Sequence, residues 1–135
     1  MRYWLLKTEP DDYSFADLQR DGVAEWDGVT SNPAQANMRQ IAEADVCVIY
    51  HTGDERRAIG LASVVRGPYP DPADPGGKRV LVDLSAAEPL PNPVPLSDLK
   101  GAAHFADSPL LRMSRLSVVP LTEEQYRELL RMSRA

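Results

Sequence analysis

Residues 46–65, VCVIYHTGDERRAIGLASVV, contain the pattern that decides the fold. The first five form a short, continuous apolar run, which is typical of a strand buried on both faces. A polar turn follows at 51–57, and IGLASVV at 59–65 is a second run with β character. A turn this short predicts antiparallel pairing, because parallel strands need a longer crossover.

Three further strands are predicted outward from this pair, at RYWLLK (2–7), RVLVDL (79–84) and RLSVVP (115–120). The segment 79–84 alternates between apolar and polar residues, as a half-buried strand does. Eight of the 12 prolines lie between 68 and 95. They predict rigid loops at 68–77 and 89–95, on either side of that strand.

Helices are predicted where capping residues precede apolar periodicity. Ser14 with Asp17 begins the first helix, and Gly22 ends it. After a loop at 24–31, Asn32 as N-cap and Pro33 in the first turn predict a helix over 33–43. The remaining starts are Ser97, for one short turn ending near Gly101, and Thr122 with Gln125, for the C-terminal helix.

Together these elements predict an α+β fold. Five or six strands form a small mixed barrel, mostly antiparallel because the connections are short, and three or four helices pack on its outside. The 135 residues allow one domain, 1–135, with enough chain to bury a core.

The composition, 43% hydrophobic and 26% charged, excludes wholesale disorder. No apolar run reaches the ~18 residues of a membrane span, and the N-terminus does not resemble a signal peptide. The single cysteine, Cys47, excludes an internal disulfide. We therefore expect a soluble, cytoplasmic protein, treated as a monomer, without a metal or cofactor.

The formal net charge of -5 argues against a protein that grips duplex nucleic acid through many phosphates. It says little against a pocket that takes one base by stacking and a few polar contacts. Residues 110–135 are locally basic, with five arginines and three glutamates. Arg127, Arg131 and Arg134 are interpreted as the solvated face of the terminal helix.

Catalytic arrangements are scarce. Cys47 and His51 stand four residues apart on one strand, about 13 Å, which is too far for a hydrogen bond. With His51 and His104 the only histidines, no metal-binding spacing exists. No phosphate-binding glycine loop is present. The residues therefore predict no enzyme, although a small-molecule hydrolase with His51 as general base stays open as an alternative.

Polar and aromatic residues gather instead at strand ends and in one loop, where binding groups tend to lie. Trp4, inside a strand, is predicted to be core. For Trp26 a core role and a binding role are equally supported. The candidates found in this way are Lys7, Thr8 and Glu9 after the first strand, Trp26, Asp27 and Gly28 in the loop, and Tyr50 with His51 after the buried strand.

An ordered set of motifs resembles the EVE domain family, a branch of the PUA-like superfamily. The motifs are YWLLKTEP, WDGV, the Asn-x-x-Ala…Asn-x-Arg helix, YHT, YPDP and RLSVVPLTEEQY, spread from Tyr3 to about Leu130. The family's relatives include the thymocyte nuclear protein of animals and, distantly, the YTH domains. The resemblance implies a pseudo-barrel that binds a nucleobase, a modified cytosine in DNA or RNA, flipped into a pocket, with no catalytic function.

Matching the motifs assigns base-binding or ligand-binding positions to Lys7, Thr8, Glu9, Trp26, Asp27, Gly28, Val29, Tyr50, His51, Arg115 and Ser117. This chain departs from the family at two places. Thr30 and Ser31 stand where an arginine and an asparagine are usual, and Ala34, Gln35 and Ala36 replace an Ala-Arg-Asn run. These departures keep a second alternative open, an interaction module with a vestigial pocket.

The resemblance gives these residues expected roles. Trp26 is the candidate stacking face, and Asp27 accepts from a cytosine amino group. Gly28 and Val29 offer backbone groups, while Lys7, His51 and Arg115 supply donors toward phosphate. Each has a structural alternative: a surface ion pair between Lys7 and Glu9, a turn capped by Asp27, and a structural role for Arg115.

Overall fold

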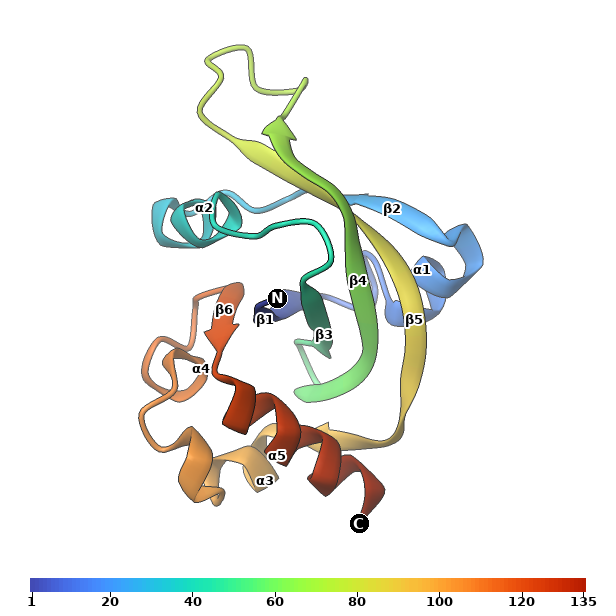
Figure 1. Ribbon diagram of the computed structural model, residues 1–135, viewed down its shortest axis with the longest axis vertical. Coiled ribbons are helices and arrows are strands. Elements are labelled where there is room, and N and C mark those ends of the chain that lie inside the picture. The colour runs from blue at the N-terminus through green and yellow to red at the C-terminus, as the bar shows by residue number, and fades with distance from the viewer.

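One six-stranded sheet forms the centre of the computed structural model, which describes residues 1–135 (Figure 1). The strands are β1 (Tyr3–Thr8), β2 (Val23–Trp26), β3 (Val46–His51), β4 (Arg57–Pro70), β5 (Val80–Pro95) and β6 (Val118–Leu121). Their order is β2-β5-β4-β3-β1-β6, and only β1 and β3 pair in parallel. The prediction of an α+β fold with a mostly antiparallel sheet is confirmed.

The sheet curls but does not close. β4 and β5 are long and strongly bent (Figure 1), with repeated register shifts where bulges interrupt their pairing. β2 and β6 remain at opposite edges of the sheet and do not pair with each other. The expected barrel is therefore an open one, and the gap between its two free edges is available for a site.

The helices surround the curled sheet (Figure 1). They are α1 (Phe15–Asp21), α2 (Asn32–Met38), α3 (Leu96–Lys100), the 3-10 turn η1 (Ala103–Phe105), α4 (Pro109–Arg112) and α5 (Glu123–Arg134). The predicted capping boxes at Ser14 and Thr122 are both present, and Gly22 ends α1 with φ 77°. Local hydrogen bonding thus determined these two helices, as the capping residues indicated.

Two helix starts and one helix end were predicted wrongly. Ser31, not Asn32, caps α2, and Pro95, not Ser97, precedes α3. α2 ends at Met38 rather than at residue 43. Beyond Met38 the N–H groups of Gln40 and Ile41 donate to carbonyls three residues back, which forms turns instead of a continued helix. Asp45 then accepts the backbone N–H groups of Ala42 and Arg2, each at 2.9 Å.

Several strand bounds also differ from prediction. The expected loop at 24–31 begins with β2, which pairs with β5. The proline-rich segments expected as loops extend β4 to Pro70 and β5 to Pro95. Prolines fit there because β2 pairs only with the first part of β5, so the later part has a side that needs no ladder N–H. β6 starts at 118 instead of 115.

A contiguous core fills the inside of the sheet. Trp4 is 2% exposed, as predicted, and its indole N–H donates to Asp45 at 3.0 Å. Cys47 is fully buried, and burial raises the pKa of its thiol, so it is an unreactive core residue. None of the helices has the length and apolar character required to cross a membrane.

Candidate functional site

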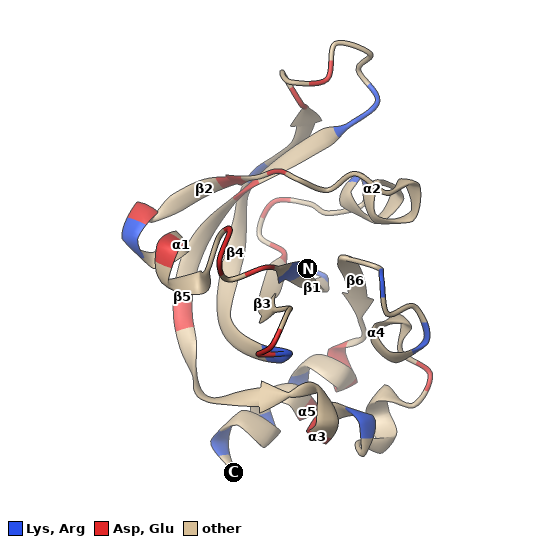
Figure 2. Cartoon of the chain, turned by 180° about the vertical axis from the view of Figure 1, so that it is seen from behind, with Lys and Arg blue, Asp and Glu red and all other residues tan.

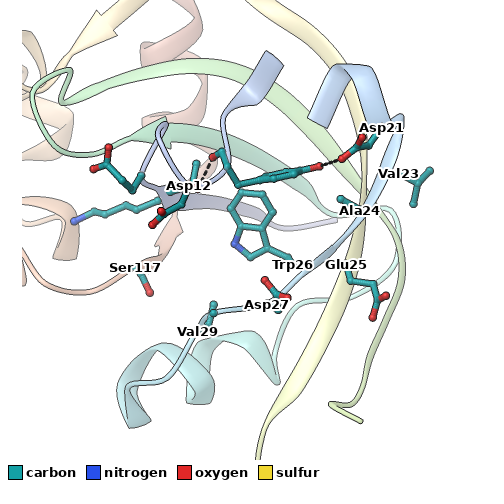
Figure 3. Close-up of a pocket in the computed structure, with 14 residues that line it drawn as sticks. Asp12, Asp21, Val23, Ala24, Glu25, Trp26, Asp27, Val29 and Ser117 are labelled. Atoms are coloured by element: carbon teal, nitrogen blue, oxygen red, sulfur yellow. Dashed lines mark hydrogen bonds between the residues drawn. The ribbon is translucent and has the colours of Figure 1, made fainter. Parts of the chain in front are cut away.

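A cavity of about 550 Å³ opens between the two free edges of the sheet (Figure 3). Its walls come from the end of β1, the chain leading to α1, all of β2 with the loop after it, and the residue before β6. The lining residues are Lys7, Thr8, Glu9, Asp12, Tyr13, Asp21, Val23, Ala24, Glu25, Trp26, Asp27, Gly28, Val29 and Ser117. Eight of the eleven predicted positions are among them.

The end of β1 supplies Lys7, Thr8 and Glu9, and each side chain has a defined partner. The Lys7 ammonium donates to the carbonyl of Ser114 at 2.9 Å, and burial lowers the pKa of this amine. Thr8 donates its hydroxyl to the Tyr13 carbonyl at 2.6 Å. Glu9 accepts from the Thr52 hydroxyl at 3.3 Å. Lys7 and Glu9 therefore do not form the surface ion pair considered as an alternative.

Trp26 ends β2 and is 6% exposed, so most of its ring is covered. The Tyr13 ring packs edge-on against it, with centroids 6.2 Å apart. The Trp26 Nε1–H has no acceptor within the protein, and no fully enclosed polar side-chain atom is unpaired, so this N–H opens to the cavity. Figure 3 shows the indole nitrogen directed between Asp12, Ser117, Asp27 and Val29. Trp26 thus belongs both to the core and to the cavity wall.

The loop after β2 presents Asp27, Gly28 and Val29 to the cavity. Gly28 has φ 75°, a left-handed conformation that favours glycine. Asp27 makes no hydrogen bond within the protein, so its carboxylate does not cap its own turn. From α2, the buried amide of Gln35 fixes this loop by donating to the Val29 carbonyl at 2.8 Å and accepting the Val80 N–H at 2.9 Å.

Six lining residues were missed by sequence reasoning: Asp12, Tyr13, Asp21, Val23, Ala24 and Glu25. Tyr13 donates its hydroxyl to Asp21 at 2.7 Å, and burial together with this bond raises the Tyr13 pKa to about 12. No motif singles out Tyr13, and residues 24–31 were predicted to be a loop, not the strand that β2 forms there. No local pattern in the sequence indicates that the edge strand β2 would form a wall of the cavity.

Tyr50, His51 and Arg115 lie outside the cavity lining. His51 is 6% exposed, and both ring nitrogens are engaged. Its Nε2 accepts the backbone N–H of Phe15 at 3.0 Å, and its Nδ1 donates to Glu55 at 3.0 Å. Tyr50 is 3% exposed and faces the Lys7 ammonium at 5.9 Å from the ring centre. The structure therefore does not bring these three predicted residues together with Trp26.

The fold is an open, mostly antiparallel sheet that curls around a cavity between its free edges. ASCH from Zymomonas mobilis has a similar fold, with a TM-score of 0.61 over 97% of this chain and 95% of that one at 15% identity. The chain belongs to the EVE domain family, whose model matches residues 2–132.

Its relatives support the assignment. Mouse thymocyte nuclear protein 1 is 32% identical over 158 aligned residues, covering 92% of this chain and 70% of that protein. An NMR structure of a Rhodopseudomonas palustris protein is 36% identical, with a TM-score of 0.93 over 98% of this chain and 93% of that chain. Human thymocyte nuclear protein 1, solved in complex with DNA containing 5-methylcytosine, is 27% identical, with a TM-score of 0.88 over 100% of this chain and 99% of that one.

Proposed function

We propose that this chain is a non-catalytic reader that binds a modified, cytosine-type base flipped out of a nucleic acid strand. The observation that carries the proposal is the cavity of about 550 Å³ with an unpaired indole N–H and an unpaired carboxylate on its wall. The human relative that was solved with 5-methylcytosine DNA, similar along the whole chain, supports the same class of ligand.

The chemistry of the wall matches the polar edge of cytosine. This edge carries an amino donor beside ring-nitrogen and carbonyl acceptors, and a carboxylate is a usual partner for the amino group. Asp27 supplies the carboxylate, and the Trp26 N–H supplies a donor for an acceptor on the base. A flipped base also needs a wall to lie against, and the indole and Val29 provide apolar surface.

The two alternatives have less support. A vestigial pocket would be filled by its own side chains, whereas this one is open. A hydrolase would need a free general base at His51. Its Glu55 partner would orient such a base, but Nε2 is already occupied by the backbone N–H of Phe15. These contacts favour a binding module over an enzyme.

The first prediction concerns Trp26→Phe, which keeps an aromatic wall and removes the N–H. We expect affinity for an oligonucleotide containing 5-methylcytosine to fall by about twofold to tenfold, the usual range for one neutral hydrogen bond. Fluorescence anisotropy at low salt measures it, with cytosine and 5-hydroxymethylcytosine oligonucleotides alongside. Trp26→Ala, which also removes the wall, should weaken binding further.

Trp4→Phe is the matched control, because it makes the same change at an indole whose N–H bonds Asp45 away from the cavity. It should lower stability and leave the affinity of the folded protein unchanged. The proposal is wrong if no base binds at low salt, or if Trp26→Phe and Trp26→Ala bind as the unaltered protein does while remaining folded.

A further inference from the structure

The cavity is strongly acidic. Its lining carries five carboxylates, those of Glu9, Asp12, Asp21, Glu25 and Asp27, against the single ammonium of Lys7, a formal charge of -4. In Figure 2 acidic residues lie on β2, on α1 and in the chain between β1 and α1, and basic residues lie between α4 and β6, while α1 and the β4–β5 hairpin carry residues of both signs. A ligand inside this cavity therefore meets a negative field.

Two of these carboxylates are free to act on a ligand. Asp21 is held by Tyr13 and Arg20, Glu9 by Thr52 and the backbone of Asp11, and Glu25 accepts from the Tyr69 hydroxyl at 3.4 Å. Asp12 and Asp27 make no side-chain hydrogen bond or ion pair, and Figure 3 places them on either side of the Trp26 indole nitrogen. The cavity thus presents two unpaired negative charges around one space.

The one cation does not offset them. The Lys7 ammonium is directed to the Ser114 carbonyl at 2.9 Å. The half-buried position of Lys7 further disfavours its charged form, and this lowers its pKa. No arginine lines the cavity. A phosphate group has no ion-pair partner there except Lys7, so the ligand enters with its phosphates outside.

The Trp26 N–H adds an independent requirement. The Trp26 side chain is 6% exposed. Its indole N–H has no acceptor in the protein and points into the space between Asp12 and Asp27. A ligand that fills the cavity displaces the water that reaches this N–H, and a donor then left without an acceptor is unfavourable. The occupant must therefore offer an acceptor to the indole as well as donors or positive charge to the carboxylates, which a simple metal ion does not.

We propose that the cavity prefers a base that is cationic at neutral pH, such as N3-methylcytosine, over a neutral base of equal size. This inference rests on the proposed base-reading function and adds the charge class of the ligand. N3-methylcytosine keeps a carbonyl acceptor for the Trp26 N–H and an amino donor for Asp27, and its charge interacts with both free carboxylates. 5-Methylcytosine offers the same carbonyl and amino groups without the charge, and its N3 remains an acceptor.

The experiment compares two cytidines with one methyl group each, at N3 in the cationic nucleoside and at C5 in the neutral one. N3-methylcytidine and 5-methylcytidine are titrated into the protein by calorimetry at pH 7 and low salt. We expect the cationic isomer to bind about tenfold tighter or more, from one unit charge pair a few Å apart at intermediate dielectric. Single-stranded oligonucleotides carrying either base distinguish recognition within a strand from recognition of the free nucleoside.

Two variants test whether the carboxylates of Asp12 and Asp27 cause the preference for the cationic nucleoside. Asp12→Asn and Asp27→Asn keep shape and remove charge, so each should narrow the ratio of cationic to neutral affinity several-fold. Asp11→Asn is the matched control, because Asp11 neighbours Asp12 in the chain and does not line the cavity. It should leave the ratio within about twofold, since exposed charges farther away are screened.

Equal binding of the two isomers overturns this inference and leaves the base-reading function standing. Binding of neither isomer, free or within a strand, overturns both. Displacement of N3-methylcytidine by spermidine at equal concentration makes the cavity a general cation site and also overturns the inference. A preference that survives the double variant Asp12→Asn with Asp27→Asn contradicts the assigned cause.

Discussion

His51 shows how one residue can resemble a functional group and serve the structure. It follows a buried strand, where binding groups tend to lie, and it was the natural candidate for a general base. Its ring instead joins β3 to the start of α1 through the Phe15 N–H and to Glu55 through the other nitrogen. Both nitrogens are used, so the side chain holds α1 in place beside the cavity.

Replacing this ring gives a prediction at the scale of the residue. His51→Ala leaves the buried Phe15 N–H without an acceptor and opens a cavity, so the free energy of unfolding should fall by about 2–4 kcal/mol. Urea denaturation measures it. Base affinity of the folded fraction should not change. Lost affinity at full stability would place His51 in the binding site instead.

α2 controls the cavity through one internal side chain. Gln35 spans the gap between the Val29 carbonyl and the Val80 backbone, and so joins the β2–α2 loop to the start of β5. Gln35 stands at a departure from the family pattern. In this chain the glutamine at that position holds the loop, because its side-chain amide bonds the Val29 carbonyl.

Gln35→Leu removes both contacts at similar volume. The Val80 N–H then loses its acceptor, and we expect a loss of about 1–3 kcal/mol of stability, together with weaker base binding as the loop loosens. Chemical denaturation and anisotropy give the two values. Gln40→Leu is the control, because its amide only accepts an exposed bond from Arg2 at 3.3 Å. Equal effects of the two variants would contradict a role for α2 in loop position.

At the scale of the whole molecule, several carboxylates make the stability depend on acid pH. The Ser14 N–H lowers the pKa of Asp17, the Arg79 and Lys78 backbone N–H groups lower that of Asp74, and the His51 ring lowers that of Glu55. Each pKa is lower in the folded chain than in the unfolded one. The stabilisation is therefore complete above the pKa that these carboxyl groups have in the unfolded chain. It is lost as the pH falls through their pKa in the folded chain.

The urea midpoint should accordingly hold between pH 5 and 7 and fall below about pH 4. A double variant, Asp17→Asn with Asp74→Asn, should be less stable at pH 7 and lose less on acidification. Asp11→Asn removes an exposed carboxylate without a hydrogen-bond partner, so its urea midpoint should change with pH as that of the unaltered protein does. Parallel pH profiles for all three proteins would show that these carboxylates do not govern the acid response.

Local signals in the sequence determined the element types. The apolar run at 46–50, the capping residues Ser14 and Thr122, and the alternation at 79–84 each depend on hydrogen bonds or side-chain periods within a few residues. The ordered motifs carried the family resemblance and, together with the polar residues at strand ends, eight of the fourteen lining positions. The proline-rich extensions of β4 and β5 were missed because pairing with a distant strand overrode the local preference for a loop.

The tertiary structure alone decided what the cavity is. Lys7, Trp26 and Ser117 are separated by up to 110 positions, and the strand order brings them around one space while His51 turns away. The net charge of -5 did not indicate that the acidic excess would converge on this space. Which groups remain unpaired there depends on contacts across the curled sheet, and no local pattern encodes these. The proposed ligand class follows from those unpaired groups.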